Sequence, residues 1–372
     1  MLTFIGSRIF DGEQFHDDSA LVVDGGRVRA ILPHGERSRS GETRDLGGGV
    51  LAPGFVDWQV NGGGGVLFNE TPTPEGIRAI AEAHRRFGTT ALLPTVITDA
   101  PDVLAAALAA AREKIPGSLG VHVEGPYIDV RRKGAHPAEW IRAMTQADAT
   151  QLIEAREGVM VVTVAPVSVA NETIARLAAS GVIVSVGHAE ASAEEARAAF
   201  DAGARAATHL YNAMTQLGHR SPGLVGAALA DSRIFCGFIA DGFHVHETAA
   251  RVAFAAKGPN RLVLISDAMP SAAGGPHRYE LHGRVVTQVG LKLTLEDGTL
   301  AGAAITMIDA VRYMAAMGIP LADVLRMATS TPAKLLRIEN AHGALKPGAR
   351  ADLAHLSDEL ELRGVWMAGV AV

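Results

Sequence analysis

The sequence predicts an α/β protein, a (β/α)8 barrel of the TIM type with a small β-sandwich domain formed by both chain termini. Eight short apolar runs alternate with helical stretches in the middle of the chain, which is typical of parallel strands joined by crossover helices. The length of 372 residues leaves room for a barrel of about 250 residues and an accessory piece. Both ends of the chain carry short β-like segments separated by turns.

The eight predicted barrel strands are apolar runs that break into polar loops. Helix-start signals separate them: Thr73 precedes Pro74 as an N-cap, and Ser192 forms a capping box with Glu195. No glycine-rich dinucleotide fingerprint with a suitable acid follows the first strand, so a doubly wound sheet has little support. The strands are expected near residues 53–60, 89–95, 119–124, 160–166, 181–187, 205–209, 234–240 and 261–267.

The two ends of the chain are expected to pair with each other. Asp24-Gly25-Gly26 is a hairpin signal between apolar runs, and the C-terminal segments GALKPGARADLAHL and LRGVWMAGVAV are again strands with turns. Neither end can bury a core alone. We therefore predict that residues 1–50 and 343–372 form the β-sandwich domain and that residues 51–342 form the catalytic barrel.

Composition and charge argue against a nucleic-acid-binding protein and against a membrane protein. The net charge of −6 is mild and the basic residues are scattered, so neither nucleic acid nor an anionic membrane is expected as a partner. The single cysteine, Cys236, fits a reducing compartment. The N-terminus lacks a basic region followed by an apolar core, and no apolar run approaches the roughly 20 residues of a membrane span. A cytoplasmic enzyme is expected.

Four polar residues stand where predicted strands end: Glu124, His188, His209 and Asp267. In a barrel these ends meet at the face that carries the active site. Two imidazoles and a carboxylate form a metal site with a position left open for water, and an aspartate beside it can carry a proton. Considered alone, each residue has an ordinary structural explanation. Glu124 would be an acid at the rim of the barrel, each histidine a hydrogen-bonded side chain, and Asp267 a helix cap. Their coincidence at the ends of four strands favours a metal-dependent hydrolase.

The motifs around these residues resemble the N-acetylglucosamine-6-phosphate deacetylase family of the amidohydrolase superfamily. The segments that carry the resemblance are HVEGPYI, GHAEAS, THLYNAM, IADGFHVHE and LISDAMP, and it extends to APGFVDWQVNG and GALKPGARADLA near the two ends. One departure is Val167, which follows Ala165-Pro166 where the family often has glutamate. The resemblance implies hydrolysis of the acetamide of N-acetylglucosamine 6-phosphate, with Asp267 as the proton carrier.

The first barrel strand indicates how many metal ions to expect. Many superfamily members have His-x-His there and bind two metals, whereas this chain has Gln59-Val60-Asn61. Alternation places Gln59 and Asn61 on one face of the strand, and neutral amides are weak zinc ligands. We expect one divalent ion per subunit on Glu124, His188 and His209. Zinc is the first choice, and iron, manganese or cobalt suit the same ligands.

The resemblance also assigns the substrate contacts. It implies that Arg220 binds the substrate phosphate and reaches across a homodimer into the neighbouring site, and that His244 is a second phosphate ligand. Asn212 and Ala213 match the pair whose amide groups hold the phosphate, and His136 matches a histidine that polarises the acetamide carbonyl. Two of these residues also have an explanation without a binding role. Arg220 could be a solvated charge in a loop, and His136 could be a surface histidine.

The remaining histidines receive smaller roles. His246 forms a His-x-His pair with His244, but the predicted ligand set is already complete. His122 shares a strand face with Glu124 and could support the metal ligands, and His219 receives no role. Two alternative functions stay open: an amidohydrolase for another N-acetylated compound such as N-acetylgalactosamine 6-phosphate, and a catalytically silent binding barrel.

Overall fold

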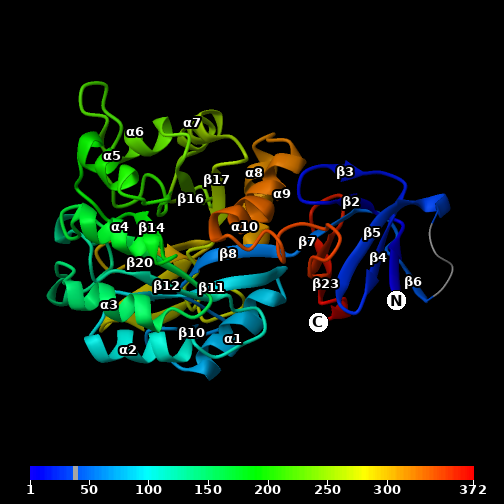
Figure 1. Cartoon of the computed structure of the whole chain (residues 1–372), viewed down its shortest axis with the longest axis horizontal. Helices are drawn as coiled ribbons and strands as arrows, with labels where there is room; N and C mark the ends of the chain where they lie inside the picture. The colour runs from blue at the N-terminus through cyan, green and yellow to red at the C-terminus, as the bar shows by residue number, and fades with distance from the viewer. Residues whose placement is uncertain (37–40) are drawn as a thin grey trace.

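The structure is a computed structural model that describes residues 1–36 and 41–372. Its centre is a sheet of eight parallel strands that follow one another in sequence order around a barrel (Figure 1). The predicted fold class and all eight predicted strands are confirmed. The strands are β8 (Phe55–Val60), β11 (Thr89–Ile97), β12 (Gly120–Glu124), β13 (Val159–Val164), β14 (Ile183–Val186), β15 (Ala206–Ala207), β16 (Phe235–Ile239) and β17 (Leu262–Ile265).

Helices connect the barrel strands and begin at the expected caps. Thr73 accepts the Gly76 N–H at the start of α1, and Ser192 forms a capping box with Glu195 at the start of α5. Within the described residues, no helix has the length and apolar character to cross a membrane. The helices are α1 (Pro74–Arg85), α2 (Pro101–Ala110), α3 (Gln146–Ala155), α4 (Asn171–Ala179), α5 (Ala193–Asp201), α6 (Gly223–Ala230), α7 (Glu247–Lys257), α8 (Met307–Ala316), α9 (Leu321–Ala328), α10 (Ser330–Leu336), and the 3-10 turns η1 (His34–Glu36), η2 (Val130–Arg132) and η3 (Ala138–Trp140).

The first and last barrel strands, β8 and β17, meet at a seam held partly by side chains. The carboxylate of Asp57 in β8 is fully buried and accepts hydrogen bonds from the backbone N–H and the hydroxyl of Ser266. The N–H of Asn61 donates to the carbonyl of Ala268 at 2.9 Å. Burial raises the pKa of Asp57 to about 7 although the Ser266 hydroxyl lowers it. The residues on both sides of Asp267 thus bond to β8 and to the residue that follows it.

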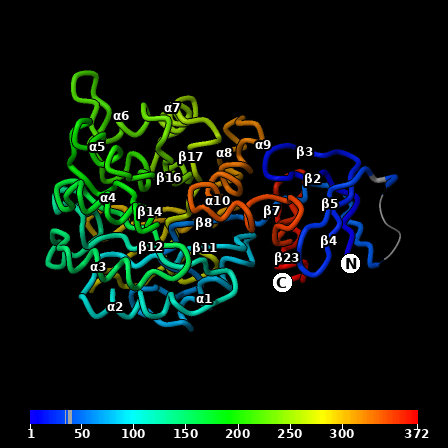
Figure 2. The backbone as a smooth tube through the Cα atoms, viewed as in Figure 1, coloured from blue at the N-terminus to red at the C-terminus, as the bar shows by residue number. Residues whose placement is uncertain are grey.

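The chain termini form two further sheets that share one apolar core. Phe4 from the first strand packs edge-on against Trp366 from the end of the chain, with ring centroids 5.1 Å apart. The blue and red ends of the tube lie side by side in Figure 2. One sheet has the order β5 (Arg27–Pro33), β4 (Ser19–Asp24), β1 (Leu2–Ile5) and β6 (Glu42–Asp45); the other has β24 (Val370–Ala371), β23 (Leu362–Met367), β22 (Leu353–Leu356), β7 (Val50–Pro53), β2 (Arg8–Phe10) and β3 (Phe15–His16).

These sheets confirm that the two ends pair, while the domain limits at residues 50/51 and 342/343 stay a prediction. The hairpin predicted at Asp24-Gly25-Gly26 is present, because Asp24 pairs with Arg27 and both glycines have positive φ. Such a two-residue turn suits glycine, which adopts positive φ without steric cost.

A four-stranded antiparallel sheet follows β17 and was not predicted from the sequence. Leu281, Thr299 and the residues 300–302 of its last strand reach the cavity at the carboxyl ends of the barrel strands. Ala303 at its end forms a bridge with Ala268 beside the barrel seam. The sheet consists of β18 (Arg278–Leu281), β19 (Arg284–Val289), β20 (Lys292–Leu295) and β21 (Leu300–Ala303); a small ribbon of β9 (Gly62–Gly63) and β10 (Val66–Leu67) lies after β8.

Candidate active site

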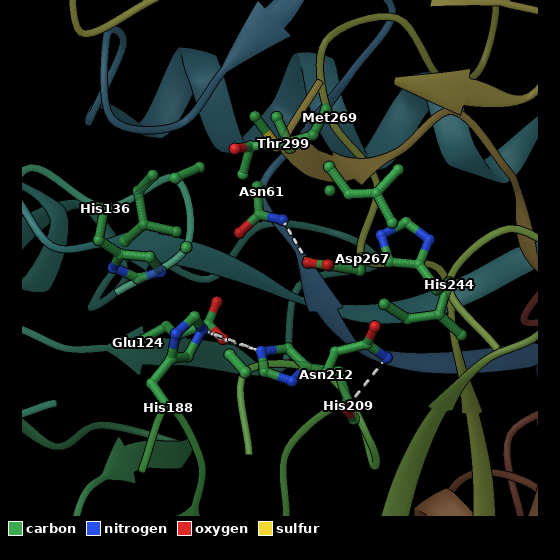
Figure 3. Close-up of a pocket in the computed structure, with 18 of the residues that line it drawn as sticks. Asn61, Glu124, His136, His188, His209, Asn212, His244, Asp267, Met269 and Thr299 are labelled. Atoms are coloured by element: carbon green, nitrogen blue, oxygen red, sulfur yellow. Dashed lines mark hydrogen bonds and ion pairs between the residues drawn. The ribbon is translucent and has the colours of Figure 1, made fainter. Parts of the chain in front are cut away.

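A cavity of about 390 Å³ lies at the carboxyl ends of the barrel strands, and the strand-end residues line it. Glu124 ends β12, His188 and His209 follow β14 and β15, and Asp267 follows β17. All four line this cavity (Figure 3). Barrel enzymes carry their chemistry at this face, because loops after the strands can vary while the strands hold their positions.

Glu124, His188 and His209 converge on one point. The Nε2 atoms of the two histidines are 3.0 Å apart, and Glu124 Oε1 lies 3.0 Å from His209 Nε2 and 3.3 Å from His188 Nε2. All three side chains are buried. A tetrahedral ion with ligand distances of about 2.0–2.1 Å separates neighbouring ligand atoms by roughly 3.3 Å. The three side chains therefore fit a single divalent metal ion.

The orientation of His188 supports this fit. Its Nδ1 lies 2.8 Å from the carbonyl oxygen of Arg132. A carbonyl only accepts hydrogen bonds, so Nδ1 carries a hydrogen, and Nε2 is the nitrogen left to offer a lone pair to a metal ion beside Glu124 and His209. Metal-bound histidines are usually held in this way by a partner on the other ring nitrogen.

Glu124 and His209 form a close charged pair within this cluster. Burial alone would raise the pKa of Glu124, but the hydrogen bonds and charges of His188 and His209 outweigh it and hold this pKa well below its usual range. Burial alone would lower the pKa of His209, but its hydrogen bond to Glu124 raises it. A buried carboxylate is costly unless it is paired or bound to a cation. The cluster keeps Glu124 ionised, as a metal ligand must be.

Asp267 lies beside this cluster and is held by two amides, one from Gln59 in β8 and one from Asn61 directly after it. Asn61 Nδ2 donates to Asp267 Oδ1 at 2.7 Å (Figure 3), and Gln59 Nε2 donates to the same oxygen at 3.1 Å. Gln59 Nε2 also lies 3.2 Å from both oxygens of Glu124. Burial, followed by the charge of Glu124, raises the pKa of Asp267 to about 6. Gln59 thus bridges the two carboxylates, and Asn61 holds Asp267 alone.

Backbone strain is concentrated at the same place. Five residues other than glycine have positive φ at or next to the site: His188 (47°), His209 (32°), Tyr211 (78°), Ala213 (51°) and Asp267 (48°). Such conformations cost about 1–3 kcal/mol each and persist only where the surrounding structure enforces them. Three of them, His188, His209 and Asp267, lie two residues beyond the end of a barrel strand and line the cavity.

The structure brings four of the predicted substrate residues to the cavity: His136, Asn212, Ala213 and His244. His244 is fixed by Asp241, whose Oδ2 lies 2.6 Å from His244 Nδ1. The ring of His136 packs against that of His188, with centroids 4.5 Å apart. His136 is buried rather than on the surface.

The other candidate residues lie elsewhere. Among the described residues, those that line the cavity do not include Arg220, which is exposed in the loop before α6 together with His219. His246 caps α7 through a hydrogen bond from the Thr248 N–H, in keeping with its exclusion from the ligand set. His122 lies below the cluster and hydrogen-bonds to Thr163 Oγ1 at 2.7 Å.

Two sets of contacts in the site were not predicted from the sequence. Gln59 and Asn61 were noted only as absent metal ligands, although they orient Asp267 and Glu124. Thr98, a buried residue directly after β11, bonds to His136 and received no role. The available signal was the strand-end position of Thr98 itself, which resembles that of the four site residues.

Comparison with known proteins agrees with this geometry. The chain is 42% identical over 329 residues to the N-acetylgalactosamine-6-phosphate deacetylase of Shewanella sp. (strain ANA-3), which covers 87% of this chain and 83% of that protein. It is 34% identical over 365 residues to the N-acetylglucosamine-6-phosphate deacetylase of Haemophilus influenzae, with 95% of this chain and 94% of that protein covered.

Solved structures and the family match extend the likeness to the whole fold. The crystal structure of N-acetylglucosamine-6-phosphate deacetylase from Pasteurella multocida superimposes with a TM-score of 0.96 at 34% identity, covering 100% of this chain and 99% of that one. Residues 50–372 match the amidohydrolase family. The family and the buried Glu124–His188–His209 cluster agree on a site for a divalent metal ion. The chain belongs to the amidohydrolase family.

Proposed function

We propose that this chain is a metal-dependent deacetylase that hydrolyses the acetamide of N-acetylglucosamine 6-phosphate to glucosamine 6-phosphate and acetate. The observation that carries the proposal is the position of Asp267 in one cavity with Glu124, His188 and His209. The similar proteins support the substrate class, because those compared above are named as deacetylases of N-acetylated hexosamine 6-phosphates. A silent binding barrel has less support, because all four strand-end residues are present.

The metal ion would be held by Glu124 Oε1 and by the Nε2 atoms of His188 and His209. When bound, a divalent ion lowers the pKa of a coordinated water and polarises the acyl oxygen. We propose one ion per subunit, because Gln59 and Asn61 already donate hydrogen bonds to the neighbouring carboxylates. Zinc is our first choice, since two histidines and a carboxylate form an established zinc set; iron, manganese and cobalt accept the same ligands.

Asp267 moves the proton in this mechanism. Asn61 and Gln59 both donate to its Oδ1, so Oδ2 is the oxygen we assign to the proton. Oδ2 takes a proton from the attacking water as the acyl carbon is attacked, and then gives it to the sugar nitrogen as the C–N bond breaks. The amides fix the carboxylate without neutralising it, which keeps it available as a base.

His136 assists at the acyl oxygen. Burial, reinforced by the neighbouring His188, lowers the pKa of His136 well below its usual value, so the ring is neutral. A neutral imidazole polarises a carbonyl through a hydrogen bond rather than through charge. Its position against His188 places it next to the proposed metal ligands.

The phosphate would be bound at the other side of the cavity. We assign it to His244, whose ring is oriented by Asp241, and to Asn212 and Ala213. Arg220 is exposed and outside the described lining of its own cavity. We propose that it reaches the site of a partner subunit in a homodimer, where a guanidinium suits a phosphate dianion.

Subunit mixing tests this role of Arg220. Alone, Arg220→Ala should show a raised KM because it lacks the phosphate contact, and Asp267→Asn should retain only a small residual rate. Coexpressed in equal amounts, they should recover about a quarter of wild-type activity at low substrate, because half of the dimers are mixed and each has one intact site. Recovery no greater than the sum of the separate variants would place Arg220 outside the partner's site.

The 42% identical relative favours a second candidate, N-acetylgalactosamine 6-phosphate, as the preferred substrate. The metal cluster and Asp267 would act unchanged, and only sugar contacts would differ. Measuring kcat/KM for both sugar phosphates, and for the same sugars without phosphate, tests the proposal. Turnover of one or both phosphates is expected, and no acetate release from either by the metal-loaded protein would refute it.

We also place the protein in the cytoplasm, with no nucleic acid or membrane as partner. Its net charge is only −6. Cys236 is a free and buried thiol whose pKa is raised to about 11 by burial. A protonated, buried thiol is inert, and the use of a single cysteine fits a reducing compartment.

A further inference from the structure

Thr98 contacts the ring of His136 through two separate groups. It directly follows β11 and is buried, with 1% of its surface exposed. Its hydroxyl Oγ1 lies 2.8 Å from His136 Nδ1, and its backbone N–H is directed at the same nitrogen with an N–N distance of 3.3 Å. Both groups therefore approach one ring nitrogen from the wall of the cavity.

The backbone contact determines which ring nitrogen carries the hydrogen. An amide N–H can only donate, so His136 Nδ1 must offer its lone pair. A neutral imidazole has one N–H and one bare nitrogen, and the hydrogen is therefore on Nε2. The Thr98 hydroxyl can donate to the same lone pair and favours this tautomer further. Because Nδ1 is bound to the wall, Nε2–H is the donor left for the cavity that His136 lines.

Gly125 provides the space for this contact. It follows the metal-ligand candidate Glu124 and has a positive φ of 85°. A Cβ atom built on Gly125 would lie 2.1 Å from Thr98 Oγ1 and 3.7 Å from His136 Nδ1. Any larger residue would push the hydroxyl off the ring. The glycine of the HVEGP segment therefore accommodates the Thr98–His136 pair as well as the backbone turn.

We propose that Thr98 is a positioning residue that fixes His136 as the Nε2–H tautomer, so that a hydrogen-bond donor faces the oxyanion formed during amide hydrolysis. The consequence for rate rests on the proposed function. The opposite tautomer would present a lone pair to a developing negative charge, which removes a donor and adds repulsion. Loss of one oxyanion donor typically lowers kcat by about 10²- to 10³-fold.

Thr98→Val tests the proposal, because it keeps the shape and the backbone N–H but removes the hydroxyl. We expect kcat to fall about tenfold, a part of the full oxyanion effect, while KM for the sugar phosphate changes little because the phosphate contacts lie elsewhere. Thr98→Ser, which retains the hydroxyl, should recover most of kcat. Thr90→Val is the matched control: Thr90 is equally buried at the opposite end of β11, and its kcat should stay near wild type.

The tautomer itself can be measured without substrate. Nitrogen NMR of the zinc-loaded protein labelled with 15N-histidine distinguishes protonated from bare ring nitrogens, and the spectrum of His136→Gln identifies the His136 signals. We expect hydrogen on Nε2 in the wild type and a partial loss of this tautomer in Thr98→Val, which keeps the backbone donor but lacks the hydroxyl. Hydrogen on Nδ1 in the wild type, or an unchanged tautomer and kcat in Thr98→Val, would overturn the proposal. The NMR result is independent of whether the substrate is the proposed one.

Discussion

Replacing Asp267 by asparagine is expected to lower kcat by roughly 10²- to 10⁴-fold, the range measured for loss of a positioned general acid–base. The substitution keeps the shape and can keep the hydrogen bonds from Asn61 and Gln59 to Oδ1. It removes Oδ2, the oxygen to which we assign the proton. Because Asp267 is not one of the three residues whose ligand atoms converge, the metal content of the variant should be unchanged.

The pH profile gives a second measure of the same carboxylate. Without metal, burial and the charge of Glu124 raise the pKa of Asp267 to about 6, and a bound cation lowers it. Activity should therefore fall as pH drops through a value at or below about 6, where the base becomes protonated. Asp267→Asn should lack this acid limb in its residual rate. Wild-type turnover in Asp267→Asn, with metal content confirmed, would refute the proton-carrier role.

Replacing Glu124 by glutamine is expected to abolish metal binding together with activity. The amide has nearly the same shape but no charge, so it leaves only two histidines to hold the ion. Loss of several kcal/mol of transition-state stabilisation corresponds to roughly a 10³-fold or greater fall in kcat. Elemental analysis of the purified variant and an acetate-release assay measure both effects.

Thermal stability supplies an independent measurement for Glu124. An ion that binds only the folded chain stabilises it by about 4 kcal/mol when free metal is 1,000 times the Kd. Chelation should therefore lower the Tm of the wild type and leave that of Glu124→Gln unchanged. Glu154→Gln, on the exposed side of α3, serves as the control and should behave as wild type. A Glu124→Gln variant that keeps a full equivalent of metal would contradict the ligand assignment.

Much of the barrel could be predicted because its strands are short, apolar and regularly spaced. The runs before Glu124, His188, His209 and Asp267 all became parallel strands, and the topology of a barrel then brings their ends to one face. The pairing of the termini followed from the inability of either end to bury a core alone. These conclusions depend on local patterns and on general rules of topology.

Other features depend on tertiary contacts that a local pattern does not encode. Asn61 and Gln59 became donors to Asp267 only because β8 and β17 close the barrel through the seam at Asp57. The contact of Thr98 with His136 joins residues 38 positions apart. The sheet from β18 to β21 was missed because its half-exposed strands lack a continuous apolar run.

We propose that the cavity of this amidohydrolase deacetylates an amino-sugar phosphate with one metal ion. The most direct test loads metal-free protein with increasing zinc and measures acetate release from N-acetylglucosamine 6-phosphate and N-acetylgalactosamine 6-phosphate. We expect activity toward at least one of them to rise linearly and to level off at about one equivalent per chain, the capacity of a single three-ligand site. Activity that requires two equivalents, or no acetate release from either sugar phosphate at any loading, would contradict it.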